Sequence, residues 1–178
     1  MSIYSALVSQ LEADYTKYLI EHIENVKKAW SLMKSNQEVI DYIQDFTKED
    51  NIDGMISQLD RDISEHDNSK FGKDEFNAYR KEFYPVSKEE QDENKKEYDR
   101  AWKHHYTHNL HHWDWYYHNN RMDDMPIINV IHMICDWEAM GYKYGNNSKK
   151  WYSENKKDIH LGEKQRQFAE GLMDIICK

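Results

Sequence analysis

The sequence predicts an all-α protein, and three observations support this. Proline occurs only twice and glycine six times in 178 residues. Apolar and polar residues almost never alternate as they do in half-buried strands, whereas apolar residues recur at spacings of three and four. A chain of this length can bury one sizeable core. We therefore predict a single-domain helical bundle over residues 1–178.

The first expected helix runs from about Ile3 to Met33 and carries one broad apolar face, with a break near Leu19 as an alternative. Asn36 is a suitable N-cap for a short helix that ends at Phe46.

Two further helices are expected before residue 85. Asn51 or Asp53 can cap a helix that leads to a His-Asp pair at residues 66–67, and Lys73–Phe83 forms the next helix. The dipeptide Tyr84-Pro85 ends that helix, because proline disfavours a helical residue before it.

Ser87-Lys-Glu-Glu90 is a capping box, which predicts the start of a long helix to about His118. After an expected loop at residues 119–125, Pro126 suits the first turn of a core helix that ends between Gly141 and Gly145. Ser148 and Asp158 are expected to start two closing helices.

The composition limits the partners. With 33 acidic and 24 basic residues, the formal charge is −9, so polymeric nucleic acid is disfavoured and a small anionic substrate held by a metal is compatible. No apolar run approaches the roughly 18 residues that cross a bilayer, and the N-terminus lacks a signal-peptide pattern. Cys135 and Cys177 are expected to be reduced thiols in a cytoplasmic protein. The sequence is also compatible with self-association into a homo-oligomer.

Four residues are candidate metal ligands: His22 in the first helix, the adjacent pair His66-Asp67, and Asp136. Asp136 lies in an apolar helical run, so we expect it to be buried, where a carboxylate needs a cation or several donors. Imidazole and carboxylate together suit borderline divalent ions such as manganese, iron, cobalt or zinc, with magnesium as a further candidate. If a second ion is present, Asp67 can bridge the two.

These motifs resemble the HD-domain superfamily, metal-dependent phosphohydrolases named after their His-Asp doublet. Its first helix often reads His-x-x-x-Val-x-x-Ala, which here is His22, Val26 and Ala29. The doublet is often followed by a lysine three positions on, here Lys70, although Ser69 replaces the more common glycine. The motif-bearing core covers about residues 15–145. The string His-Asp-x-Ser-Lys-Phe is also similar to a branch of small bacterial and phage proteins for which no substrate is implied.

The resemblance implies an HD-like helical fold in which the four ligands hold an ion. Such an ion lowers the pKa of bound water and offsets charge on a phosphoryl oxygen. Lys70 would pair with a non-bridging oxygen of the substrate; the alternative is a surface ammonium.

A histidine-rich segment follows, with six of the ten histidines between residues 104 and 118. If this segment is helical, His105 and His112 share a face and flank Asn109, while three others form a neighbouring stripe. The resemblance implies that such histidines bind a second ion or donate to the phosphate. The members of the stripe are His104, His108 and His111. The favoured catalytic residues are His105, His111 and His112. The residues expected to be structural are His118, His132 and His160.

Substrate contacts are expected from Lys70, Asn109, Trp102 and Lys143. A tryptophan can stack on a nucleobase, although aromatic residues at helical spacing more often pack in a core.

We therefore predict a metal-dependent phosphohydrolase that acts on a nucleotide or a related small phosphate ester. A monophosphatase or a triphosphate hydrolase is favoured over a cyclic-nucleotide phosphodiesterase. The alternatives are a non-catalytic metal-binding protein and an acidic helical interaction protein whose histidines are incidental.

Overall fold

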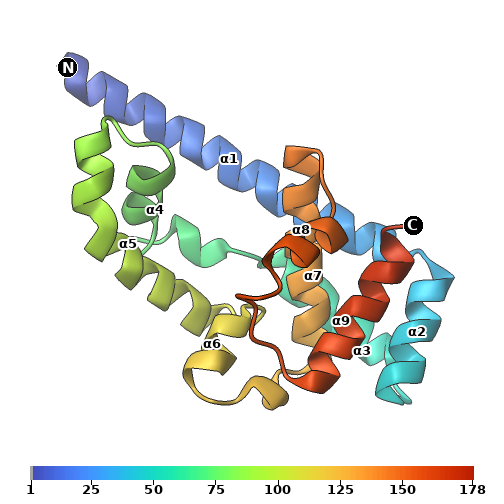
Figure 1. The fold of residues 1–178 in the computed structure, drawn as a ribbon. Helices are drawn as coiled ribbons and strands as arrows, with labels where there is room; N and C mark the ends of the chain where they lie inside the picture. Colours follow the sequence, from blue (N-terminus) through green and yellow to red (C-terminus); the bar gives the residue numbers. More distant parts are fainter. Residues whose placement is uncertain (1) are drawn as a thin grey trace. The chain divides into compact units, whose positions relative to one another are not determined.

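The computed structural model describes residues 2–178, and these residues contain nine α-helices, two short 3-10 helices and no strand, which confirms the all-α prediction (Figure 1). The α-helices are α1 (Ile3–Lys34), α2 (Gln37–Thr47), α3 (Ile52–Ser64), α4 (Phe76–Phe83), α5 (Lys88–His108), α6 (Trp113–His118), α7 (Ile127–Tyr144), α8 (Ser148–Asn155) and α9 (Glu163–Ile176). The 3-10 helices are η1 (Asn68–Phe71) and η2 (Met122–Asp124).

The chain forms two compact units, each made of two separate segments. Unit 1 comprises Met1–Ile23 and Asp67–Asn109, and unit 2 comprises Glu24–His66 and Leu110–Lys178. The helix α1 therefore contributes its first part to unit 1 and the remainder to unit 2. The single domain over residues 1–178 stays a prediction.

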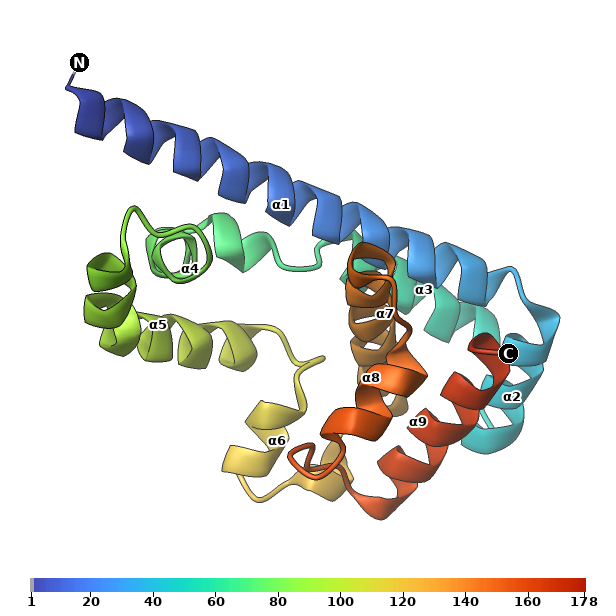
Figure 2. The same ribbon diagram turned by 45° about the horizontal axis from the view of Figure 1, so that its top comes forward.

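Unit 1 packs α4 and α5 against the first part of α1 (Figures 1 and 2). Its small apolar core joins Tyr15 and Leu19 of α1 to Tyr79 of α4 and Ala101 of α5. The buried Asn94 side chain links α5 to α4 by a hydrogen bond, in which its Nδ2 donates to the carbonyl oxygen of Ala78 over 2.8 Å.

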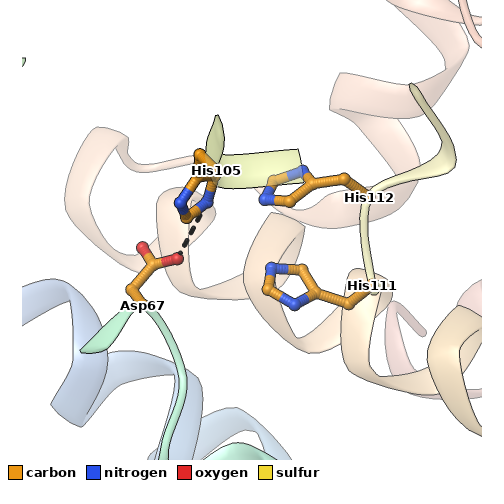
Figure 3. Close-up of side chains that lie close together, drawn as sticks. All are labelled: Asp67, His105, His111 and His112. Atoms are coloured by element: carbon orange, nitrogen blue, oxygen red, sulfur yellow. Dashed lines mark ion pairs between the residues drawn. The ribbon is translucent and has the colours of Figure 1, made fainter. Parts of the chain in front are cut away.

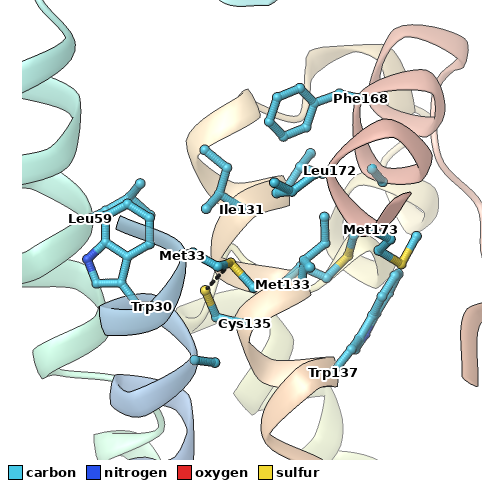
Figure 4. Close-up of a cluster of buried hydrophobic side chains, with 14 of the residues drawn as sticks. Trp30, Met33, Leu59, Ile131, Met133, Cys135, Trp137, Phe168, Leu172 and Met173 are labelled. Atoms are coloured by element: carbon cyan, nitrogen blue, oxygen red, sulfur yellow. Dashed lines mark hydrogen bonds between the residues drawn. The ribbon is translucent and has the colours of Figure 1, made fainter. Parts of the chain in front are cut away.

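Unit 2 has the larger core, built around α7, which is buried on most of its surface (Figure 4). Apolar side chains of α7 contact those of α1, α3 and α9 in one cluster. Residues of this cluster that Figure 4 labels are Trp30, Met33, Leu59, Ile131, Met133, Cys135, Trp137, Phe168, Leu172 and Met173. A helix that is apolar on most faces must be covered on most faces, and this explains the central position of α7.

The helix starts that depend on local capping agree with the sequence. The side chains of Asn36, Asn51 and Ser87 each accept a hydrogen bond from a backbone N–H two or three residues later. At the C-terminal end of α7, Gly145 adopts a left-handed conformation with φ of 68°, a conformation that favours glycine. No break occurs in α1 near Leu19.

The prediction of one helix from Ser87 to His118 was wrong, because α5 ends at His108 and α6 begins at Trp113. Asn109 leaves the helical conformation with φ of −120° and ψ of 88°. Its side-chain Nδ2 donates to the carbonyl oxygen of His105 over 2.9 Å and to the hydroxyl of Ser69 over 2.9 Å. An asparagine side chain that bonds to the backbone of the preceding turn in this way competes with helix continuation.

Two other predicted starts were wrong. The helix α4 begins at Phe76 rather than Lys73, because residues after the His-Asp pair first form η1. The helix α9 begins at Glu163 rather than Asp158, with Gly162 at its N-cap. None of the helices in residues 2–178 combines the length and the hydropathy needed to cross a bilayer.

Candidate metal centre

The group of polar side chains in unit 1 is centred on the Asp67 carboxylate, which is only 1% exposed. His22 Nε2 lies 3.5 Å from Oδ2. His105 Nε2 lies 3.2 Å from Oδ1, the contact that Figure 3 marks with a dashed line. Lys70 Nζ lies 2.6 Å from Oδ2. Two imidazoles and one ammonium therefore surround one buried carboxylate.

The backbone at Asp67 is unusual, since its φ of 58° and ψ of 12° lie in the left-handed region. Aspartate is one of the few residues other than glycine that visit this region, at a cost of about 1–2 kcal/mol. Lys70 N–H donates to the Asp67 carbonyl oxygen over 2.9 Å and so closes η1. This turn brings Lys70 back onto the Asp67 side chain.

Glu75 contacts the side of the His105 ring that faces away from Asp67. Its carboxylate is fully buried and is surrounded by donors. His105 Nδ1 lies 2.9 Å from Glu75 Oε2, and His104 Nδ1 lies 2.6 Å from Oε1. The Ser69 hydroxyl donates to Oε2 over 3.1 Å. The His105 ring thus lies between two buried carboxylates, Glu75 on Nδ1 and Asp67 on Nε2.

The electrostatics of unit 1 follow from this arrangement. Burial and the Lys70 cation act to lower the pKa of His105, but the hydrogen bond and charge of Asp67 and the hydrogen bond to Glu75 outweigh them, so its pKa is raised. Burial acts to raise the pKa of Glu75, but hydrogen bonds from His105, His104 and Ser69 prevail and lower it.

The group in unit 2 contains His66, His111, His132 and Asp136. His66 Nε2 lies 4.0 Å from Asp136 Oδ1, and His111 Nε2 lies 4.0 Å from Oδ2. On its other side, His66 Nδ1 lies 2.9 Å from His132 Nε2. One ring nitrogen from each of the three histidines lies within 4.8 Å of the others. Asp136 is 17% exposed, so the expectation that it is buried was only partly right.

These distances suit metal binding better than direct hydrogen bonding. Atoms 4.0 Å apart are too distant for a hydrogen bond. An ion held at about 2.0–2.2 Å from each ligand can contact both atoms of such a pair. The 3.5 Å separation of His22 Nε2 and Asp67 Oδ2 also matches two ligands of one ion. The donor set in both units is therefore compatible with a divalent ion.

The predicted metal ligands divide between the units: His22 and Asp67 belong to unit 1, and His66 and Asp136 belong to unit 2. The peptide bond between His66 and Asp67 links the two groups covalently.

The histidine-rich segment divides in the same way. His105 is fully buried beside Asp67, while His104 and His108 stack on each other on the more exposed side of α5. His111 and His112 lie beyond the end of α5, and their ring centroids are 4.3 Å apart in unit 2 (Figure 3). The helical-face argument that paired His105 with His112 was wrong, because the helix ends between them.

The remaining predicted residues take different positions. Trp102 stacks on the His105 ring, with centroids 5.8 Å apart. Asn109 bonds to Ser69 and to the His105 backbone, which makes it part of the support for the group. Lys143 lies in the last turn of α7, about two turns beyond Asp136.

Comparison with protein families adds one finding. A model of a family of unknown function, DUF5662, matches residues 11–178. The chain belongs to this family. No curated protein and no solved structure matches the chain. The family description names no activity or cofactor for this DUF5662 protein.

Two members of these groups were not identified from the sequence. In this DUF5662 protein, His132 was expected to be structural, and its Nε2 lies 2.9 Å from His66 Nδ1. Its position four residues before Asp136, on the same helical face, was the available signal for this contact. Glu75 carries no comparable signal, because Lys73-Asp74-Glu75 matches the charged first turn of the helix expected at Lys73–Phe83.

Proposed function

We propose that this protein is a metal-dependent phosphohydrolase of the HD type, acting on a nucleotide or a related small phosphate ester. One observation carries the proposal: the buried Asp67 carboxylate is flanked by two imidazoles and one ammonium. The adjacent His66, with His111 and Asp136, supplies a second group of the same chemistry.

The proposed ligands fit a divalent cation for a physical reason. Buried carboxylates need a cation or several donors, and mixed imidazole and carboxylate ligands favour manganese, iron, cobalt or zinc over calcium. When bound, such an ion activates water and offsets the charge on a phosphoryl oxygen. We propose that His22, His66, Asp67 and Asp136 hold the ion or ions, with one or two ions present.

Lys70 is proposed to bind the substrate. Its ammonium forms an ion pair with Asp67 and lies 5.2 Å from the centre of the Tyr79 ring. Metal binding by Asp67 would offset the charge that holds Lys70 there. The ammonium can then pair with a non-bridging phosphate oxygen, since lysine acts as a point charge for phosphate.

A small substrate is favoured over a polymer. The overall charge of −9 opposes nucleic acid, but a groove in unit 1 beside His104 contains the cations Lys73, Lys81 and Arg100. Asp74 and Glu97 also line this groove, so its positive charge is local and modest. This pattern suits a compact phosphate ester.

A phosphate-release screen tests the proposal. Nucleoside mono-, di- and triphosphates, cyclic nucleotides and simple phosphate esters are each supplied with Mn²⁺, Co²⁺, Mg²⁺ or Zn²⁺. We expect at least one combination to release phosphate or, for a cyclic nucleotide, to open the ring. We expect Asp67→Asn to lose that activity. His108→Gln is the matched control, because His108 is the last residue of α5 and its side chain is exposed.

A non-catalytic metal-binding protein is the second candidate, since the same ligand distances support metal binding without turnover. Elemental analysis and the screen separate the alternatives. Bound metal with no turnover favours this second candidate, whereas neither metal nor turnover favours a helical interaction protein.

A further inference from the structure

Glu75 is a fully buried carboxylate, and both of its oxygens contact histidine rings. Its two oxygens are shared between neighbouring residues of α5: Oε1 contacts His104 and Oε2 contacts His105. His104 is 34% exposed, whereas His105 is fully buried. Because a buried carboxylate without partners is costly, Glu75 and His105 constrain each other strongly.

The contact with Glu75 determines which nitrogen of His105 carries a proton. A carboxylate oxygen accepts hydrogen bonds, so the 2.9 Å contact requires a proton on His105 Nδ1. An ion can then be bound only by Nε2, the nitrogen that lies 3.2 Å from Asp67 Oδ1, where it would replace the proton that Nε2 can share with that oxygen. Histidines that bind metals usually donate their other N–H to a carboxylate or carbonyl in this way.

We propose that Glu75 is a positioning residue that makes His105 a metal ligand. It holds the ring with Nδ1 protonated and Nε2 directed to the ion bound by Asp67. This inference rests on the proposed metal site and decides between the two roles that the sequence left open for His105. His105 is a ligand rather than the proton donor to the leaving group.

Neighbouring contacts support a fixed ring rather than a mobile one. The Ser69 hydroxyl donates to Glu75 and accepts from Asn109 Nδ2 over 2.9 Å. Asn109 also bonds to the carbonyl oxygen of His105. Trp102 stacks against one face of the ring. Glu75 is thus the charged member of the group that surrounds the His105 ring, with Ser69, Asn109 and Trp102. These contacts hold His105 Nε2 toward Asp67.

Two variants separate the hydrogen bond from the volume of the side chain. Glu75→Met removes the acceptor at similar volume, and Glu75→Gln retains one acceptor oxygen for His105. We expect titration calorimetry with Mn²⁺ to show about 10- to 100-fold weaker binding for Glu75→Met, the range for losing such a partner. Glu75→Gln should restore most of the affinity. His104→Gln is the control, because it leaves the bond between Glu75 and His105 in place.

Nitrogen-15 NMR of the wild-type protein loaded with Zn²⁺ provides a measurement that needs no variant to fold. The expected spectrum shows His105 with a protonated Nδ1 and a metal-shifted Nε2. A proton on Nε2 in the loaded protein would overturn the inference. So would Mn²⁺ binding by folded Glu75→Met at wild-type affinity, although the proposed function would then stand. Wild-type protein that binds neither metal would overturn both.

Discussion

His66 Nδ1 lies 2.9 Å from His132 Nε2, and both rings are buried. Only one of the two nitrogens can carry the shared proton. If His66 uses Nε2 to bind an ion beside Asp136, its Nδ1 must donate and His132 must accept. His132 lies one turn before Asp136 on α7, so a single helix carries a proposed ligand and the partner of another.

We therefore predict that replacing His132 alters metal retention. His132→Phe keeps an aromatic ring but cannot accept a hydrogen bond. The metal content of the purified protein, measured by elemental analysis, should therefore fall. His132→Gln retains an acceptor and should retain more metal. Circular dichroism establishes that both variants are folded. Equal, full metal content in both folded variants would contradict the role of His132.

Asp136→Asn should preserve the helical fold and lose most of the metal and the activity. Asp136 lies 4.0 Å from two imidazole nitrogens, and the amide keeps its shape without the charge that attracts a cation. Elemental analysis and thermal unfolding provide the measurement. If the carboxylate were merely structural, the variant would be at least as stable as wild type and would keep its full metal content.

The ion pair between the buried Arg80 and the partly buried Glu90 should make unit 1 sensitive to acid. The two guanidinium nitrogens donate to the two Glu90 oxygens over 2.8 and 2.9 Å, and these bonds lower the pKa of Glu90. Because the pKa of Glu90 is lower in the folded state, the stabilisation is complete above the unfolded pKa of about 4.3. It is lost as the pH falls through the folded value.

Glu90→Gln tests this pair. Because it leaves the Arg80 cation buried, we expect a loss of about 3 kcal/mol in the free energy of unfolding at pH 7. Urea titrations at several pH values should show the difference from wild type shrinking below about pH 4. A difference that does not change with pH would mean that the charge of Glu90 does not contribute.

Gly171→Ala should destabilise unit 2, although alanine is normally favoured over glycine within a helix by about 1 kcal/mol. A Cβ atom at this position in α9 would overlap the Tyr42 hydroxyl and lie 2.7 Å from the ring carbon that carries it. Displacing that ring also disturbs its stacking on Phe168. We expect a net loss of about 1–3 kcal/mol, the usual cost of overpacking.

The background Tyr42→Phe isolates the cause of this effect. It removes the nearest overlapping atom, so the penalty of Gly171→Ala in thermal unfolding should be smaller there than in wild type. An equal penalty in both backgrounds would assign the effect to something other than Tyr42.

Features that depend on nearby residues were predictable from the sequence. The helical periodicity is a local property, and the Asn36, Asn51 and Ser87 caps bond only two or three residues away. The His66-Asp67 pair and Asp136 could be singled out because unusual residue types stand beside helical apolar runs. These local signals determined the all-α class and the candidate ligand types.

Other features depend on partners that are distant in the chain, and only the tertiary structure decided them. The end of α5 depends on the bond from Asn109 to Ser69, 40 residues away. Glu75 meets His105 across 30 residues, and His66 meets His132 across 66. Helical periodicity specifies the face on which a side chain lies but not which segment packs against that face. The roles of Glu75 and His132 therefore depend on the packing of each unit.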